Sequence, residues 1–204
     1  MTPRQKATID AYSSLMEEAK SRIASIISVL EGRTQLSEIF ADEYCTLQLR
    51  LLCEIIALGC LTAHGDIPET KATRLRKQYK ADRIISLLAG LHAEFYPRPV
   101  RQVPPDPPRT YGLEDREEAE YLTKRELIKL AGRCGEGLHR GTMHDLSLKS
   151  LSPEEIFAYT TKIALLVDIH WFTLRSGDPH YLCAMNGGRD GRVGIEVLQP
   201  PSKP

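Results

Sequence analysis

A run of six prolines between Pro97 and Pro108 limits the fold of this chain more than any other feature. The segment is PRPVRQVPPDPP. Proline has no amide hydrogen and clashes with a preceding helical turn, so the segment cannot be helical. We expect an extended, polyproline-like connection on the surface, with a docking peptide for a proline-binding domain as the alternative. The helical patterns before and after it therefore belong to separate helices.

Apolar residues recur at helical spacing over most of the remaining chain. Five helices are expected, over residues 3–31, 35–62, 70–95, from 123 into a glycine-rich stretch, and 152–174. Their starts carry N-capping signals: Thr2 before Pro3, Thr123 three residues before Glu126, and Ser152 before a proline. Gly32 is expected to end the first helix in the left-handed conformation.

The last part of the chain changes period. Val193, Ile195 and Val197 alternate with other residues as in a strand, and the glycine-rich stretch 186–191 suits a hairpin loop. Because an isolated hairpin is only marginally stable, it is expected to pack on the helices or pair with another chain. The predicted fold is all-α, an up-and-down bundle of about five helices with a small C-terminal β-hairpin.

The predicted domain organisation is simple, since 204 residues suit one domain. A helical bundle should cover residues 1–175, with the hairpin as an appendix over 176–199 and a frayed tail over 200–204. The formal net charge is zero, so an anion site has to be a local patch. The polar N-terminus and the short apolar run at 163–174 predict a cytoplasmic protein without a membrane span, which needs about 20 residues.

The five cysteines are odd in number and include no Cys-x2-Cys pair. Reduced, buried thiols explain this pattern best, and no structural zinc is expected. No cofactor is expected either. A metal site from Cys134, His139 and His144 is a minor alternative, because the ligand spacing does not favour it.

The stretch from Tyr121 to Gly141, YLTKRELIKLAGRCGEGLHRG, carries the candidate site. Arg133 supplies a positive fork that fits a phosphate, and His139 supplies a proton-transfer group near neutral pH. On a continuous helix these two side chains would lie about 120° apart. The glycines at 132, 135 and 137 are therefore expected to bend the chain and bring Arg133 and His139 together.

Arg133, five residues and then His139, in a mostly helical chain, resembles the HEPN superfamily. Members are small helical bundles, often dimeric, and many are metal-independent endoribonucleases with an Arg-x4-6-His motif. Cys134 stands where the family usually has a polar residue. The resemblance implies that His139 moves a proton and Arg133 holds the phosphate, with Arg140 on a neighbouring phosphate and His144 assisting. It also implies RNA as the substrate and a homodimer that sets two such motifs side by side.

Other interpretations use the same residues. Arg133 could be a surface charge paired with Glu126 or Glu136, and His139 could cap its helix. Glu54 is assigned to substrate binding if it faces inward, and otherwise forms a surface ion pair with Arg50. The competing function is a non-catalytic helical interaction module, which binds a protein or RNA partner through the basic helix at 70–95 and the proline segment.

A further histidine, His170, lies in the apolar run of the last expected helix. It is assigned to the core rather than to a ligand site.

Overall fold

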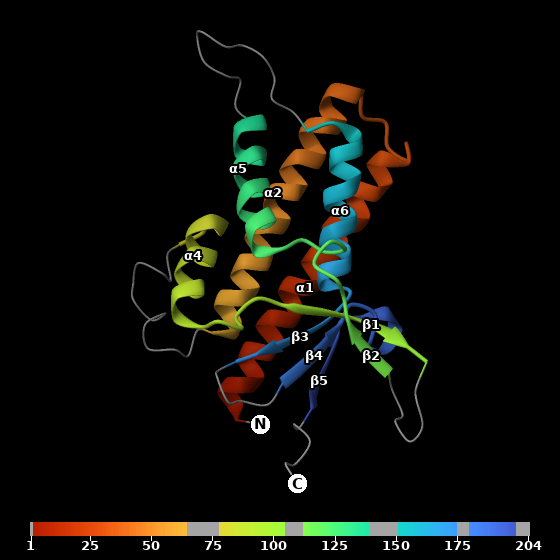
Figure 1. Ribbon diagram of the computed structural model, residues 1–204. Coiled ribbons are helices and arrows are strands. Elements are labelled where there is room, and N and C mark those ends of the chain that lie inside the picture. Colours follow the sequence, from red (N-terminus) through yellow and green to blue (C-terminus); the bar gives the residue numbers. More distant parts are fainter. Residues whose placement is uncertain (1, 65–77, 105–111, 139–150, 175–179, 199–204) are drawn as a thin grey trace.

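The computed structural model describes residues 2–64, 78–104, 112–138, 151–174 and 180–198. These residues form a mixed α/β fold in which helices stand over an antiparallel sheet (Figure 1). The helices are α1 (Pro3–Leu30), α2 (Glu38–Ala63), α4 (Ala81–Leu91), α5 (Lys124–Gly137) and α6 (Pro153–Val167). The predicted all-α, HEPN-like bundle with a small hairpin is therefore wrong, because the hairpin is part of a larger sheet.

The sheet has five strands within the described residues. They are β1 (Arg98–Val103), β2 (Gly112–Asp115), β3 (Ile169–Thr173), β4 (His180–Ala184) and β5 (Gly194–Leu198). Their order is β2-β1-β3-β4-β5, and each neighbouring pair is antiparallel. Because β3 lies before residue 175 and β4 after it, the sheet joins the expected bundle and the expected hairpin appendix.

The proline segment contributes β1. Its extended backbone was predicted correctly, but it is a strand of the sheet and not a surface connection. Pro97, Pro99 and Val100 are buried, and Pro99 lies opposite His170 of β3. The pairing with β3 is short, and the carbonyl of Pro99 accepts a hydrogen bond from the amide of Arg116 at 3.1 Å. Proline is tolerated here because the strand is short and irregularly paired.

The last helix is shorter than predicted. It ends at Val167, and the apolar residues 169–173 form β3 in place of two further helical turns. A short apolar run rich in aromatic residues fits a buried strand as well as a helix, so its period alone does not decide. The pairing of β3 with both β1 and β4 decides the conformation.

The predicted helix starts are confirmed. Thr2, Thr123 and Ser152 each accept a hydrogen bond from the amide three residues later, and that residue's side chain accepts one from the cap's own amide. Gly32 has a φ of +68°, which is the left-handed conformation expected after α1. Of the basic helix expected over 70–95, the structure describes α4, and residues 70–77 lie outside the described part.

The C-terminal hairpin is attached to α1 by polar contacts. Lys20 Nζ donates to the carbonyl of Met185 at 3.0 Å, and the amide of Val193 donates to Glu17 Oε1 at 2.7 Å. The hairpin therefore contacts the first helix of the chain. The frayed tail expected at 200–204 lies outside the described residues.

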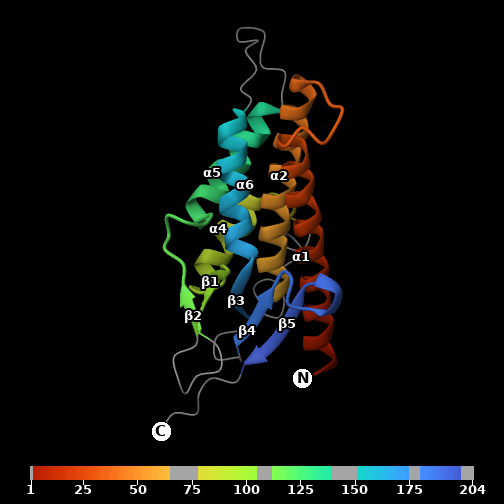
Figure 2. The same ribbon diagram turned by 90° about the vertical axis from the view of Figure 1, so that its right-hand side faces the viewer.

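The helix α2 is central to the bundle and packs against α1, α4, α5 and α6. Figure 2 shows α1 and α2 on one side of the molecule and α5 and α6 on the other. Within the described residues, the segment Phe40–Ala63 of α2 is long and apolar enough to cross a membrane by length and composition. Most of this segment is buried, as in the core helix of a globular domain.

Candidate functional site

The helix that carries Arg133 is continuous. The capping box at Thr123 starts α5, and the helix passes Gly132 and Gly135 without interruption to Gly137. The bend that was expected at these glycines is not present. Helical glycine is unfavourable by only about 1 kcal/mol relative to alanine, so packing of the buried face of α5 against α2 is enough to hold the helix.

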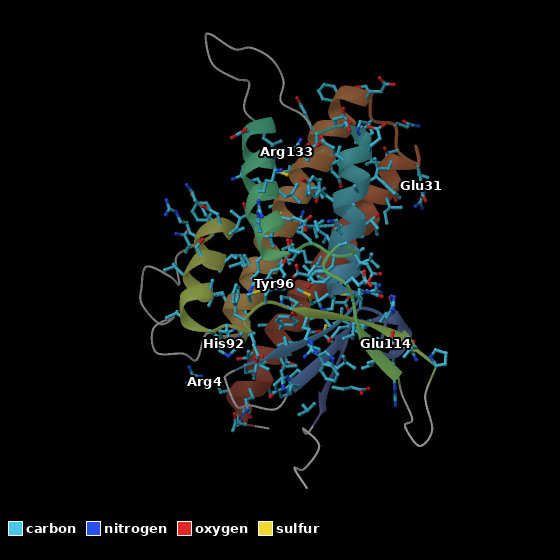
Figure 3. The ribbon with its side chains drawn as sticks, viewed as in Figure 1. Arg4, Glu31, His92, Tyr96, Glu114 and Arg133 are labelled. Atoms are coloured by element: carbon cyan, nitrogen blue, oxygen red, sulfur yellow. The ribbon has the colours of Figure 1, made fainter. Side chains whose placement is uncertain are left out.

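Arg133 binds a carboxylate of the neighbouring helix. Its Nη1 and Nη2 donate to Oε1 and Oε2 of Glu155 at 2.7 and 3.0 Å. These bonds raise the pKa of Arg133 above its ordinary value and lower the pKa of Glu155. Figure 3 places Arg133 in the upper part of the bundle, away from the sheet. The sequence alternatives, Glu126 and Glu136, are not its partners within the described residues.

Glu155 is also part of the capping box of α6. It is the third residue of that helix, and its Oε2 accepts the amide hydrogen of Ser152 at 3.1 Å. A second link lies at the first turn of α5, where Lys162 Nζ of α6 donates to Oε1 of Glu126 at 2.6 Å. Two ion pairs therefore join α5 to α6. In this arrangement Arg133 links α5 to α6, and the two terminal nitrogens that would bind a phosphate are bonded to Glu155.

The other members of the predicted Arg-x5-His site are His139, Arg140 and His144, and all three lie outside the described residues. Cys134, which follows Arg133, is fully buried, and burial raises the pKa of its thiol to about 12. The thiol is therefore protonated at neutral pH and is not a nucleophile there.

A cleft of about 440 Å³ opens on the opposite side of α5, between α2, α4 and α5. It is referred to below as the α2–α4–α5 cleft. Its lining residues are Arg50, Glu54, Lys80, Ala81, Asp82, Ile128, Ala131, Gly132 and Gly135. The volume is within the range of about 300–1,000 Å³ that is usual for small-molecule sites. Glu54, predicted to bind substrate, lies here, whereas Arg133 is turned towards α6, so the structure does not bring these two side chains together.

The charges of the cleft are only partly compensated. Arg50 Nε donates to Glu54 Oε1 at 3.2 Å, and Asp82 faces Arg83 at 3.8 Å. Lys80 has no ion-pair partner among the described residues. The lining therefore carries two cations, Arg50 and Lys80, and two carboxylates, Glu54 and Asp82, and Arg83 adds a third cation just outside it.

The N-terminus of α4 adds positive potential beside Lys80. Lys80 is its N-cap residue, and no described side chain caps the helix by a hydrogen bond. The first amides of a helix carry a partial positive charge and attract anions. Asp82 in the first turn reduces this effect but is already paired with Arg83.

Two glycines form one wall of the cleft. A Cβ atom added to Gly132 or Gly135 would meet no described atom within 4 Å, and neither residue has a positive φ. The fold would therefore accept larger residues at both positions. The effect of the two glycines is to leave space open along the surface of α5.

His170 is fully buried. Its Nδ1–H donates to the carbonyl of Val167 at 3.0 Å, which leaves Nε2 to accept the hydroxyl hydrogen of Tyr12 at 2.7 Å. Burial lowers the pKa of His170 to about 4, so the ring is neutral at physiological pH. The assignment of this histidine to the core is confirmed, although it stands on β3 and not on a helix.

Sequence reasoning missed a second pair of rings. His64 follows the end of α2 and His92 follows the end of α4, and their ring centroids are 4.7 Å apart. His64 Nδ1–H donates to the carbonyl of Cys60 at 2.8 Å, and burial lowers the pKa of His64. Within the described chain, no cluster of three or more His, Cys, Asp or Glu side chains could hold a metal ion.

The cleft itself was also missed, apart from Glu54. Lys80 belongs to the basic helix that was expected over residues 70–95, and Gly132 and Gly135 were expected to bend the chain. The signal in the sequence was the pair of glycines three residues apart in a well-capped helix. Comparison of the chain with protein-family models, curated proteins and solved structures gives no match.

Proposed function

We propose that the protein is a binding domain whose α2–α4–α5 cleft receives a small anionic group of the phosphate type. The observation that carries this proposal is the glycine wall opposite the charges of the cleft. Gly132 and Gly135 together make α5 about 2 kcal/mol less favourable than alanines would, and neither close packing nor backbone conformation requires them. What the two glycines do provide is open space in the cleft, which larger side chains at these positions would fill.

The charges of the cleft support an anion rather than a cation. Lys80 lines the cleft without an ion-pair partner among the described residues, and the N-terminus of α4 beside it adds a partial positive charge. The bond from Arg50 to Glu54 uses Nε, so the two terminal nitrogens of Arg50 have no other partner among the described side chains. A phosphate could accept hydrogen bonds from these nitrogens, from Lys80 and from the first amides of α4.

The cleft also supports a ligand with an apolar part. Ile128 and Ala131 lie in the lining between the glycines and the charged rim, and Ile128 is 36% exposed. A phosphate joined to a flat or apolar group, as in a nucleotide, matches this arrangement. The phosphate source is either a free nucleotide or the backbone of a single-stranded RNA.

Binding to the cleft can be measured by titrating adenosine monophosphate and, separately, a short oligouridylate into isotope-labelled protein. The amides of Lys80, Asp82, Gly132 and Gly135 should shift, and Lys80→Ala should weaken binding about tenfold, or about 1.4 kcal/mol. Gly132→Leu should abolish binding because the side chain enters the cleft, while leucine favours the helix. The matched control is Lys129→Ala, an exposed lysine of α5 that does not line the cleft. Equal binding by the Gly132→Leu variant would remove the cleft from consideration.

A metal-independent endoribonuclease is the second candidate function. The position of Arg133 favours it, because the side chain is one-third exposed near the C-terminal end of α5, shortly before His139 in the sequence. In this proposal a phosphate of RNA displaces Glu155 from Arg133, and His139 moves the proton. Wild type and His139→Ala are compared on RNA in EDTA. Cleavage by wild type alone supports the proposal, and equal cleavage by both proteins, or by neither, rejects it.

A further inference from the structure

We propose that the outer face of α2 binds a second copy of this chain, with the two α2 helices antiparallel across a two-fold axis. Positions at alternating steps of four and three residues run along this face, and all but Glu54 carry apolar side chains. The row, called the α2 seam below, consists of Phe40, Tyr44, Leu47, Leu51, Leu58 and Leu61. Steps of this kind keep side chains on one face and are the pattern of paired helices.

The α2 seam is separate from the face that α2 buries in its own domain. The buried face includes Leu49, Leu52 and Ile56, each at most 1% exposed. On the seam, Phe40 is 59% exposed and Leu47 is 40% exposed, while Tyr44, Leu51 and the later leucines are partly covered. Tyr44, Leu58 and Leu61 also pack in part against the core, so the row is most exposed at Phe40 and Leu47. Exposed apolar side chains that share one face mark a contact surface. This second face explains why α2 is apolar nearly all round although it is not enclosed on all sides.

The distribution of acidic residues selects an antiparallel partner. Glu38, Asp42 and Glu43 lie in the first six residues of α2, whereas residues 55–64 contain no carboxylate. A parallel pair would set the acidic ends side by side. An antiparallel pair sets each acidic end against the carboxylate-free end of the partner and also opposes the two helix dipoles.

Glu54 occupies the one position of the row that is not apolar. If the two-fold axis passes near residues 52 and 53, Arg50 of one copy lies beside the partner's Glu54, and the same contact occurs a second time by symmetry. Arg50 and Glu54 are already paired within each chain at 3.2 Å, so the four charges form one compact cluster. The face is therefore self-complementary in charge as well as in shape.

The size of the seam sets the expected strength. From Phe40 to Leu61 the helix extends about 30 Å, and one helix pair is at the low end of interface sizes. The expected dimer is therefore weak, with a Kd on the order of micromolar. Arg50 and Glu54 border both the seam and the α2–α4–α5 cleft, whereas Leu47 does not line the cleft, so substitutions of Leu47 and of Gly132 test different proposals.

Sedimentation equilibrium between about 1 and 200 µM, a range that brackets a micromolar Kd, tests the dimer. Wild type should change from monomer to dimer over this range, and Leu47→Glu should remain monomeric. Leu87→Glu is the matched control, since Leu87 is 49% exposed on α4 and lies outside the seam. A thermal melt of each variant checks that it is folded. Monomeric wild type at the highest concentration, or equal loss of dimer in both variants, overturns the proposal.

A charge exchange tests the antiparallel register. Arg50→Glu and Glu54→Arg should each weaken the dimer at least about tenfold, because like charges then meet across the axis. The double variant Arg50→Glu with Glu54→Arg should recover wild-type association. Failure of the double variant to recover, with a normal thermal melt, overturns the register. Wild type that stays monomeric in buffer but binds neutral lipid vesicles assigns the seam to a membrane surface and likewise overturns the proposal.

Discussion

Tyr12 of α1 and His170 of β3 share a buried hydrogen bond of 2.7 Å across 158 positions of sequence. The phenol ring also stacks on Phe172, with ring centroids 4.2 Å apart. The bond joins the first helix to the middle strand of the sheet. It is therefore a buried polar contact between the helical layer and the sheet.

Loss of this bond should lower stability without changing the fold. Tyr12→Phe removes the hydroxyl and leaves His170 Nε2 buried without a donor, which should lower the free energy of unfolding by about 1–3 kcal/mol. Urea denaturation measures the change. Tyr79→Phe is the matched control, because Tyr79 is 60% exposed, and its effect should stay within about 0.5 kcal/mol. Equal effects of the two substitutions would show that the bond contributes nothing specific.

Acid should destabilise the protein through His170. Its pKa is about 4 in the fold and about 6.5 in an unfolded chain, so the unfolded chain binds the proton first as pH falls. The free energy of unfolding should fall by about 3 kcal/mol as the pH is lowered from 6.5 to 4. Above pH 6.5 His170 is neutral in both states, so it causes no loss of stability there. His64 acts in the same direction.

The measurement is the slope of unfolding free energy against pH, from urea titrations at several pH values. His170→Gln should flatten the slope between pH 6.5 and pH 4, whatever its effect at pH 7. His180→Gln, which replaces an exposed histidine of β4, is the matched control. An unchanged slope in the His170 variant contradicts the assignment.

Two glycines should respond to alanine in opposite directions. Gly132→Ala meets open space, so it should raise the free energy of unfolding by about 0.5–1 kcal/mol. Gly59→Ala places a Cβ 3.3 Å from Tyr12 Cε2, and Tyr12 is held by His170 and Phe172, so this change should lower stability by about 1–3 kcal/mol. Urea denaturation of both variants checks the signs, and stabilisation by Gly59→Ala would show that Tyr12 can move aside.

The native thiols should react slowly. All five cysteines lie in the described residues, are buried and form no disulfide, and burial raises the pKa of Cys60, Cys134 and Cys183 to about 12. A chromogenic disulfide reagent should therefore label the folded protein no faster than local unfolding exposes its thiols. In denaturant it should label all five thiols. Ser14→Cys on the exposed face of α1 should add one rapidly reacting thiol. Fast labelling of wild type would contradict the buried assignment.

Local signals in the sequence predicted local structure well. Thr2, Thr123 and Ser152 start their helices by hydrogen bonds to residues three positions later. The helix starts can therefore be predicted from residues that are close in the sequence. The sheet could not be predicted in the same way. β1 and β3 are short, one contains prolines and the other continues a helical apolar run. They join into one sheet through pairing across some 70 positions, which no local pattern indicates.

The candidate site was predictable only in part. Glu54 was selected because it interrupts an apolar helix, and it does line a cleft. The role of Arg133 depended on a partner from another helix, Glu155, which sequence spacing within α5 cannot reveal. Lys80 could not be singled out from the sequence, because its place in the cleft comes from the packing of α4 beside α5.

The attachment of the C-terminal hairpin to α1 has a consequence for how the chain acquires its structure during synthesis. Glu17 and Lys20 are made early, but their partners Val193 and Met185 are made last. Contacts of such long sequence separation form slowly, since a large loop must close first. The emerging chain therefore holds an incomplete core until nearly all residues have left the ribosome, and chaperones that bind exposed apolar helices should associate with it throughout that interval.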